Sequence, residues 1–402
     1  MTPGIVLDLV LIAMLGSYAL TGFRQGLVVS VLSLVGFLGF GALAMAYLPA
    51  LMRGWAWAVE HEMQSRILLV VGVFALATIG QGVGGFVGRR LRQQVRARPV
   101  VTADAVLGAL ASIAAVAVLI WFVAGGVRGM TNATLAKAIG ESRVLQIIDK
   151  AVPPTTGQFF AGFRQMLDRS DFPRVFEGLG KEPIIAVDPP SAGLGPAQVD
   201  ASLESVVKVK GVAQACRQGQ EGSGWVVAPG RVVTNAHVVS GLTQATVQVK
   251  GVGAALPATI VYFDARRDLA VLAVPQLAAA PLPLGGVLER GADAVVAGFP
   301  LDGPLTVDPA RVRQRLVATG ADIYGQPGTQ REIYSLYVKV EPGNSGGPLF
   351  DAQGKVVGVI FAKSIDDELT GYALTLAETR TALEAASRSQ SPVDTGACLA
   401  GG

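Results

Sequence analysis

The stretch Gly343–Leu349, with the sequence Gly-Asn-Ser-Gly-Gly-Pro-Leu, does most to decide the fold of this 402-residue chain. Glycines on both sides of Ser345 permit a tight turn whose backbone N–H groups point inward. The spacing also satisfies G-x-S-x-G, the nucleophile elbow of α/β-hydrolases, but that fold places its histidine after the serine. Because no histidine follows Ser345, the elbow is excluded and a partner for the serine has to lie earlier in the chain.

Two earlier motifs supply such partners. His237 lies in the sequence TNAHVV, and Asp268 opens the apolar run DLAVL. A serine hydroxyl is a poor nucleophile unless an adjacent base removes its proton, and imidazole, with a pKa of about 6.5, is suited to that task. The aspartate would accept a hydrogen bond from the other ring nitrogen and fix the tautomer. The order His, Asp, Ser is that of the two-barrel serine proteases, so we predict a catalytic triad of His237, Asp268 and Ser345. Asp264 competes weakly, because only Asp268 directly opens the strand.

The region around these motifs consists of short valine-rich runs separated by glycine, proline and aspartate. Many short strands with turn signals between them are typical of an all-β barrel or sandwich. We therefore predict an all-β, chymotrypsin-like double β-barrel protease domain over residues 199–402, closed by a helix over Leu376–Ser387. The expected strands are Val206–Val209, Trp225–Val227, Arg231–Thr234, Thr246–Val249, Ala270–Val274, Ala294–Ala297, Tyr334–Val340 and Val356–Ala362.

The first third of the chain has a different character and predicts a four-helix transmembrane domain over residues 1–130. Each of its four apolar runs is about long enough to cross a 30 Å hydrocarbon core as a helix. The first run lacks a basic stretch before it and is interpreted as a retained helix rather than a signal peptide. Glycines within the runs predict close helix–helix packing. The four runs are Pro3–Phe23, Gly26–Leu48, Ile67–Gly88 and Ala105–Val127.

The charges between the spans set the expected orientation. Five arginines follow the third span, at positions 89, 90, 92, 96 and 98, so that loop is expected in the cytoplasm and everything after Val127 outside it. Asp8 lies within the first span. An intramembrane carboxylate is a functional candidate, and the alternative is an interfacial acid near the outer end of a tilted helix. Because Asp8 is the only charged residue well inside a span, a channel or transporter has little support.

Residues 131–198 are expected to link the two halves. One helical face is predicted from Phe159, Phe160, Phe163, Met166 and Leu167, capped by Thr155 or Thr156. A second amphipathic pattern follows at Phe172, Val175, Phe176 and Leu179 and predicts another helix packed on the downstream domain. Prolines among small residues over 180–198 then predict an extended linker that is open to proteolysis, including self-cleavage.

Cys216 and Cys398 are the only cysteines, and the expected topology places both outside the cytoplasm. Two thiols in an oxidising compartment predict a disulfide that ties an early segment of the protease domain to the C-terminal tail. A structural staple is the main interpretation, and a redox switch is the alternative.

The two halves resemble two known families. The spans, through GFRQG at 22–26 and SVLSLVG at 30–36, resemble the colicin V production proteins, and TNAHVV, DLAVL, GNSGGPLF and GYAL resemble trypsin-like proteases of the high-temperature-requirement type. Their fusion resembles the MarP-like membrane-anchored acid-resistance serine proteases of actinobacteria. The resemblance implies a multi-pass membrane protein with a periplasmic endopeptidase domain, active in acid or oxidative stress on envelope proteins such as cell-wall hydrolases.

The resemblance also implies roles for further residues. The amides that match the family's oxyanion hole are those of Gly343 and Ser345. Lys339 matches the base of the primary specificity pocket, where it would favour acidic P1 residues; alternatively its side chain points to solvent.

Other functions are excluded or kept as alternatives. A nucleic-acid partner is not expected, because the net charge is only +3 and no basic patch is visible. No metal or other cofactor is expected, since the chain has two histidines and His61-Glu62 lacks the second histidine of a zinc-protease motif. The expected partners are protein or peptide substrates and membrane lipid. The alternative is a catalytically silent membrane scaffold whose protease-like domain binds peptides.

Overall fold

The structure is a computed structural model that describes residues 3–53, 62–93, 98–127, 133–152, 172–191, 196–213 and 218–399. Its contacts divide the chain into two compact units. One unit comprises Met1–Val123 with Ser142–Ile148, and the other comprises Ala124–Glu141 with Asp149–Gly402. The predicted helix around Phe159–Leu167, Cys216 and most of the loop after the third span lie outside the described residues.

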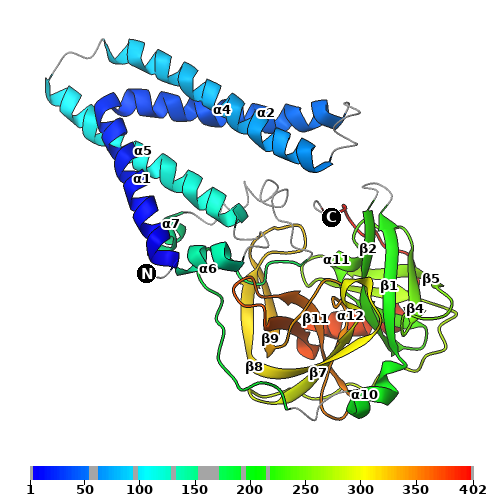
Figure 1. Ribbon diagram of the computed structural model, residues 1–402. Helices are drawn as coiled ribbons and strands as arrows, with labels where there is room; N and C mark the ends of the chain where they lie inside the picture. The colour runs from blue at the N-terminus through cyan, green and yellow to red at the C-terminus, as the bar shows by residue number, and fades with distance from the viewer. Residues whose placement is uncertain are drawn as a thin grey trace. The chain divides into compact units, whose positions relative to one another are not determined.

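Within its described residues, the first unit contains four helices that are long and apolar enough to cross a membrane, as predicted. Glycines bring α2 and α4 into direct backbone contact, and the two run side by side in Figure 1. A Cβ added to Gly36 would lie 2.1 Å from the carbonyl oxygen of Gly80, and one on Gly84 would lie 2.0 Å from that of Leu32. These contacts confirm the predicted packing role of the small residues. The helices are α1 (Pro3–Gln25), α2 (Leu27–Arg53), α4 (Glu62–Arg92) and α5 (Arg98–Val127).

The arginines after the third span are mostly helical rather than in a loop, which corrects the predicted boundary. Helix α4 continues to Arg92, and α5 already begins at Arg98. Positive charges in the last turn of a helix stabilise it by interacting with the negative end of the helix dipole. Arg92 also pairs with Asp104 at 2.9 Å. The orientation of the spans stays a prediction.

Asp8 has a local structural role. Its carboxylate accepts hydrogen bonds from the Ser142 hydroxyl at 2.5 Å and from the backbone N–H groups of Arg143 and Val144 at 3.1 and 3.2 Å. These donors form the N-terminus of the short helix α7 (Arg143–Ala151), whose unpaired N–H groups and dipole attract an anion. Asp8 therefore caps α7. A second short helix, α6 (Ala133–Glu141), belongs to the other unit.

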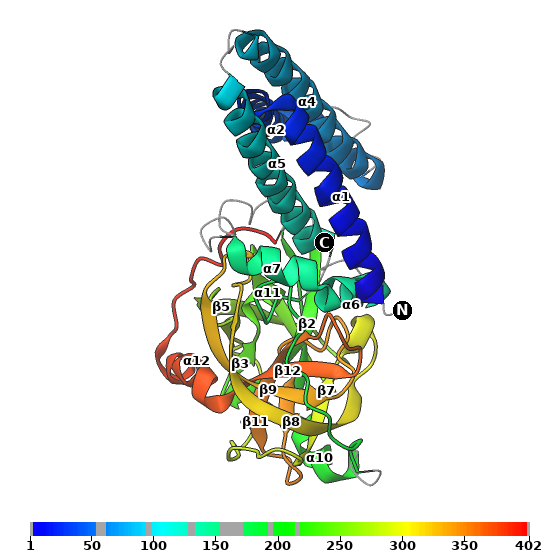
Figure 2. The same ribbon diagram turned by 90° about the vertical axis from the view of Figure 1, so that its left-hand side faces the viewer.

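The second unit is built on two six-stranded antiparallel sheets, each closed on itself, in the orders β1-β2-β3-β6-β5-β4 and β10-β11-β12-β9-β8-β7 (Figures 1 and 2). The strands of the first barrel are β1 (Val206–Ala213), β2 (Gln218–Ala228), β3 (Arg231–Thr234), β4 (Ala245–Val249), β5 (Leu256–Asp264) and β6 (Leu269–Ala273). Those of the second are β7 (Asp293–Gly298), β8 (Thr306–Gly320), β9 (Thr329–Tyr337), β10 (Pro348–Phe350), β11 (Val356–Lys363) and β12 (Thr370–Thr375). The predicted β-rich domain is thus present.

Besides α6, the helical elements described in this unit include α10 (Pro196–Leu203), the single turn α11 (Ala236–Val239), the 3-10 turn η1 (Pro300–Asp302) and α12 (Leu376–Arg388). The last matches the predicted closing helix, and its N-cap Thr375 accepts from the N–H of Glu378. A continuous apolar core runs from Trp225 in the first barrel to Tyr334 and Phe361 in the second. This shared core fixes the two barrels against each other.

The segment 172–191 forms no helix, so the helix predicted from Phe172, Val175, Phe176 and Leu179 is wrong. The backbone instead pairs with the end of β8: Ala321 donates to the Arg174 carbonyl at 3.1 Å, and Glu177 donates to the Thr319 carbonyl at 2.9 Å. Apolar side chains of the segment still pack on the protease unit, as expected. The extended stretch predicted from residue 180 is present, but Pro196 begins α10, as proline at a first helical position allows.

Candidate active site

His237 and Asp268 are joined directly in the first barrel. The imidazole Nδ1 lies 2.7 Å from Asp268 Oδ2, and the backbone N–H of His237 donates to Asp268 Oδ1 at 2.9 Å. The aspartate is fully buried and the histidine is 8 % exposed. A carboxylate that accepts from both the ring and the backbone of one residue fixes the orientation of that ring. The free Nε2 is then available as an acceptor.

Asp268 adopts a left-handed backbone conformation, with φ of 61°, in the turn between β5 and β6. Aspartate tolerates this region better than most residues. Asn235, the N-cap of α11, donates its side-chain amide to the Asp268 carbonyl at 2.8 Å. The helix that carries His237 and the turn that carries Asp268 are therefore held together by three hydrogen bonds. Asp264 does not reach the histidine and caps Arg266 and Arg267 instead.

A buried arginine supports the same turn and was not found from the sequence. Arg331 in β9 is 2 % exposed and donates to the carbonyls of Arg266 at 2.8 Å and Ala321 at 3.0 Å. Burial lowers the pKa of Arg331, while nearby carboxylates, Asp268 foremost, oppose that shift. The guanidinium thus ties the second barrel to the turn that carries Asp268. Its acceptors are backbone carbonyls 65 and 10 residues away in the chain, and nothing in the sequence around Arg331 indicates that it supports the turn of Asp268.

Ser345 lies in the loop between β9 and β10, and Ser223 of β2 anchors this loop to the first barrel. The Ser223 N–H donates to the Ser345 carbonyl at 2.7 Å, and its hydroxyl donates to the Gly343 carbonyl at 2.6 Å. The same hydroxyl accepts from the N–H of Phe299 at 3.0 Å, and Thr234 donates to the Ser223 carbonyl. Ser223 is fully buried. It is a second positioning residue that the sequence did not reveal.

The glycines of the Ser345 loop allow this close approach. Gly346, with φ of 82°, leaves no room for a side chain, because a Cβ there would lie 2.2 Å from the Ser223 carbonyl oxygen. Gly222 lies between the histidine helix and the serine loop. A Cβ added to it would lie 2.6 Å from the side chain of Val238, which is next to His237, and 3.0 Å from the carbonyl oxygen of Ser345. The structure therefore brings the serine loop and the histidine helix against the same strand. Within the described residues, no hydrogen bond joins His237 and Ser345; catalytic hydrogen bonds are often long before substrate binds.

Two amides of the loop are left without an intramolecular partner. The N–H groups of Asn344, Gly346 and Gly347 donate to backbone carbonyls, whereas those of Gly343 and Ser345 make no hydrogen bond within the described part of the chain. The Pro342 carbonyl accepts from Leu301 at 2.7 Å. In a trans peptide the N–H points opposite to the carbonyl, so the N–H of Gly343 faces away from Leu301. Two free donors two residues apart can stabilise an oxyanion.

Lys339 does not lie at the base of a pocket. Its side chain is 60 % exposed, and its ammonium pairs with Glu341 at 2.7 Å. The neighbours Val338 and Val340 are buried and face Gly371, whose Cβ would lie 2.4 Å from Val340. Side chains alternate along an extended segment, so the inward positions belong to the valines. This geometry favours the solvent-facing alternative for Lys339.

The C-terminal tail packs beneath the histidine helix. Ser240, the C-cap of α11, donates to the Ala397 carbonyl at 2.6 Å, and Gly241 donates to the Thr395 carbonyl at 3.1 Å. Cys398 is disulfide-bonded, and its Sγ lies 2.9 Å from the position of a Cβ on Gly241. The tail thus holds the end of the helix that carries His237. Among the described residues, no group of three or more histidines, cysteines or carboxylates could hold a metal ion.

Comparison with known proteins finds a family match for each half of the chain. Residues 222–359 match the trypsin-like peptidase domain, and residues 7–153 match the colicin V production protein. The serine protease Rv3671c of Mycobacterium tuberculosis is 36 % identical over 403 residues, which covers 99 % of this chain and 100 % of the relative. A crystal structure of the Rv3671c protease in its active form has a TM-score of 0.53 at 41 % identity, covering 56 % of this chain and 99 % of that one. Protease Do-like 2 from Arabidopsis thaliana chloroplasts is 30 % identical over 159 residues, 38 % of this chain and 26 % of its own.

The fold, the site and these matches define a trypsin-like serine protease joined to a colicin V production domain. The chain belongs to the family of the Rv3671c serine protease, MarP, over whose whole length it aligns. The four apolar helices and the colicin V domain together indicate a membrane protein.

Proposed function

We propose that His237, Asp268 and Ser345 form a catalytic triad that hydrolyses peptide bonds through an acyl-enzyme. His237 Nε2 takes the proton of the Ser345 hydroxyl as Oγ attacks the substrate carbonyl carbon. The negative charge passes to the carbonyl oxygen, which the N–H groups of Gly343 and Ser345 receive. The imidazolium then gives its proton to the leaving amine. Water attacks the acyl ester in the same way and restores the serine.

One observation carries this proposal. The Ser345 loop is fastened to β2 through Ser223, and the His237–Asp268 pair lies directly after β3, where Asn235 and the backbone of α11 hold the histidine helix to the turn of Asp268. The amides of Gly343 and Ser345, which donate no hydrogen bond to the described residues, lie in the loop itself. A peptide-binding scaffold without catalysis has no need for a buried carboxylate that orients an imidazole.

A fluorophosphonate probe tests the proposal, because it reacts only with an activated serine. The full-length protein in detergent should be labelled at Ser345, and labelling should vanish in Ser345→Ala and His237→Ala. Asp264→Asn is a matched control, since this acid also lies beside the site but does not contact the histidine, and it should label normally. A folded protein that takes up no probe would contradict the proposal and favour the scaffold.

We propose further that the four helices anchor the protease outside the cytoplasm, with residues 131–198 as the link and 199–402 as the protease domain. The arginines at the end of α4 and the start of α5 support this orientation. Accessibility of introduced cysteines to a membrane-impermeant maleimide tests it: a serine-to-cysteine change at Ser391, in the exposed tail, should react in intact cells.

The proposed substrates are envelope proteins, cell-wall hydrolases among them, cut in acid or oxidative stress; the resemblance to acid-resistance proteases supports this role. We also propose self-cleavage between residues 180 and 198; the part of this range from 181 to 191 is extended, and Ala186, Asp188 and Pro189 in it are exposed. Mass spectrometry of the released fragment should find a cut there in the wild type and none in Ser345→Ala.

We propose that Cys216 pairs with Cys398 in a disulfide that stabilises the protease domain; the bonded state of Cys398 supports this pairing.

A further inference from the structure

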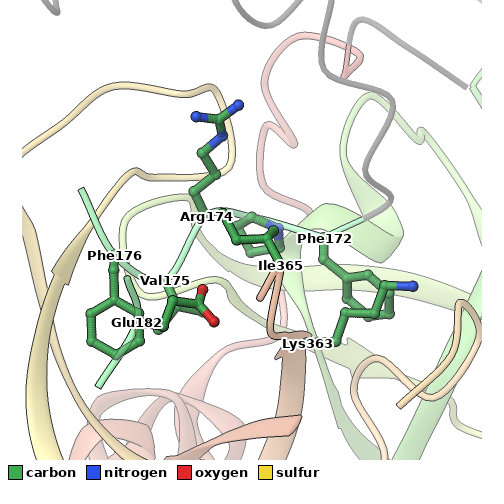
Figure 3. Close-up of a pocket in the computed structure, with 8 residues that line it drawn as sticks. Phe172, Arg174, Val175, Phe176, Glu182, Lys363 and Ile365 are labelled. Atoms are coloured by element: carbon green, nitrogen blue, oxygen red, sulfur yellow. The ribbon is translucent and has the colours of Figure 1, made fainter. Parts of the chain in front are cut away.

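The imidazole of His237 has a neighbour from outside both barrels. Phe172 lies edge-on to it, with ring centroids 6.5 Å apart and an interplanar angle of 65°. On another side of the Phe172 ring, the ammonium of Lys363 lies 5.5 Å from its centroid, and Figure 3 shows the lysine side chain along the ring. Phe172 is 5 % exposed and His237 is 8 % exposed. The proposed general base is therefore covered by an aromatic side chain.

The strand that carries Lys363, β11, is hydrogen-bonded to the serine loop. The Gly346 N–H donates to the Ile360 carbonyl, and the Ile360 N–H donates to the Gly347 carbonyl. Beyond this point β11 is paired with β12 on one side, while its pairing with β10 ends at Val359. Among the described residues no strand pairs with this edge of β11, so an extended peptide whose scissile bond lies at Ser345 can add to it as a strand.

The segment that carries Phe172 is held at the far end of the same surface. Its backbone bonds to β8 through Arg174 and Glu177, and Val175 packs into the core of the protease unit. Residues 172–176 line a pocket together with Glu182, Lys363 and Ile365 (Figure 3). Gly320 makes the approach possible, because a Cβ there would lie 2.3 Å from the Val175 carbonyl oxygen and 2.4 Å from that of Arg174.

We propose that the surface between His237, Lys363 and the end of β8 is a docking site for an extended peptide, and that its resident occupant is this chain's own segment Phe172–Leu179. The segment competes with substrate for the surface beside the general base. It has to leave before His237 can pass a proton to a leaving amine. The inference rests on the proposed catalytic function and adds an internal competitor to it.

Two variants remove the occupant by different routes. Phe172→Ala removes the side chain that covers the imidazole, and Gly320→Ala pushes the backbone of the segment off β8 without altering the segment. Gly180→Ala is the matched control, because it lies in the same stretch and has open space around its Cα. All three are made in the full-length protein, beside Ser345→Ala.

The readouts are the rate of fluorophosphonate labelling and the hydrolysis of fluorescein-labelled casein. We expect both rates to rise about tenfold in Phe172→Ala and Gly320→Ala, as for a site that is free in about a tenth of the wild-type molecules. Gly180→Ala should match the wild type. Equal or slower labelling in the two variants, with unchanged melting temperatures, would overturn the inference. If one variant fails to fold, the other decides.

A synthetic peptide of residues 172–182 separates competition from a general loosening of the domain. It should inhibit Phe172→Ala with a rise in KM and no change in kcat, and the same peptide with alanine in its first position should not. Gly320→Ala should resist both peptides, because its added methyl group blocks the backbone contact. Equal labelling of all the variants that retain Ser345 would contradict the inference but remain consistent with the proposed protease activity. No labelling of any of them would sink the proposed function as well.

Discussion

The two barrels hold their parts of the site in different ways. In the first, the side chains of His237 and Asp268 are joined directly, at 2.7 Å between Nδ1 and Oδ2. In the second, Ser345 is placed by its backbone, through the hydrogen bonds that Ser223 makes across the gap between the barrels. The proposed general base is thus assembled within one barrel, whereas the proposed nucleophile and oxyanion donors depend on how the second barrel is fastened to the first.

The largest expected effect comes from breaking the pair within the first barrel. Asp268→Asn keeps the size of the side chain but offers the wrong hydrogen-bonding partner to the imidazole, and kcat should fall by about 10⁴-fold. Steady-state hydrolysis of a peptide substrate measures the loss. Asp264→Asn should change kcat less than threefold or so. Comparable losses in both variants would mean that Asp268 has no special relation to His237.

The second largest effect concerns the tail that supports the histidine helix. Cys398→Ser removes a covalent tie and should cost about 2–4 kcal/mol of stability, or a fall in melting temperature of about 5–15 °C. Ser391→Ala, in an exposed part of the same tail, should leave the melting temperature within about 1 °C. A melting temperature that neither Cys398→Ser nor a reductant alters would show that the tail does not brace the first barrel.

The link between the barrels is tested by Ser223→Ala. This change leaves the buried N–H of Phe299 without an acceptor and frees the Gly343 carbonyl, so kcat should fall about 10- to 100-fold with little change in KM. Ser335→Ala is the matched control, because Ser335 is equally buried and its hydroxyl makes no hydrogen bond among the described residues. Unchanged kcat in Ser223→Ala would mean that the loop is positioned by the second barrel alone.

The smallest effect is expected at a pH-sensitive contact between the barrels. Asp302 pairs with Lys208 and Lys210 of β1, and hydrogen bonds from these lysines lower its pKa from 3.8 to about 2. Its stabilising effect is therefore complete above about pH 4 and is lost as the pH falls towards 2. The melting temperature of the wild type should exceed that of Asp302→Asn above pH 4 and converge with it near pH 2. Because Asp302 is partly exposed, the difference should be a few degrees at most. A difference that grows with acidity would contradict this account.

The sequence predicts the parts of the site that reside in single motifs. His237, Asp268 and Ser345 each lie in a short run of residues with its own signature, and the order of the runs identifies the class. Ser223 and Arg331 escape detection, because the contacts that give them their role, from Ser223 to the Ser345 loop and from Arg331 to Arg266, join residues more than 60 positions apart in the chain. Nothing local distinguishes them from other polar residues in strands. The side chain of Lys339 points to solvent because side chains alternate along an extended segment and its neighbours Val338 and Val340 point inward. Matching the position of Lys339 to that of a family residue does not take this alternation into account.

The segment Phe172–Leu179 shows why a helical spacing of apolar residues is not sufficient to predict a helix. Its spacing fits one face of a helix, yet Gly178 has a φ of 83°, which a helix does not allow, and the end of β8 offers the backbone other partners. The same apolar residues are buried in either case. Periodicity predicted their burial correctly and their backbone conformation wrongly.

The most direct test of the central claim is the pre-steady-state burst with p-nitrophenyl acetate, because only an acyl-enzyme releases product before turnover. The wild-type full-length protein should release about one equivalent of p-nitrophenol per folded molecule, with the acetyl group found on Ser345 by mass spectrometry. Asp268→Asn should acylate far more slowly, and Ser345→Ala should give no burst. A burst that persists in Ser345→Ala, or a folded wild type without one, would contradict the proposed triad.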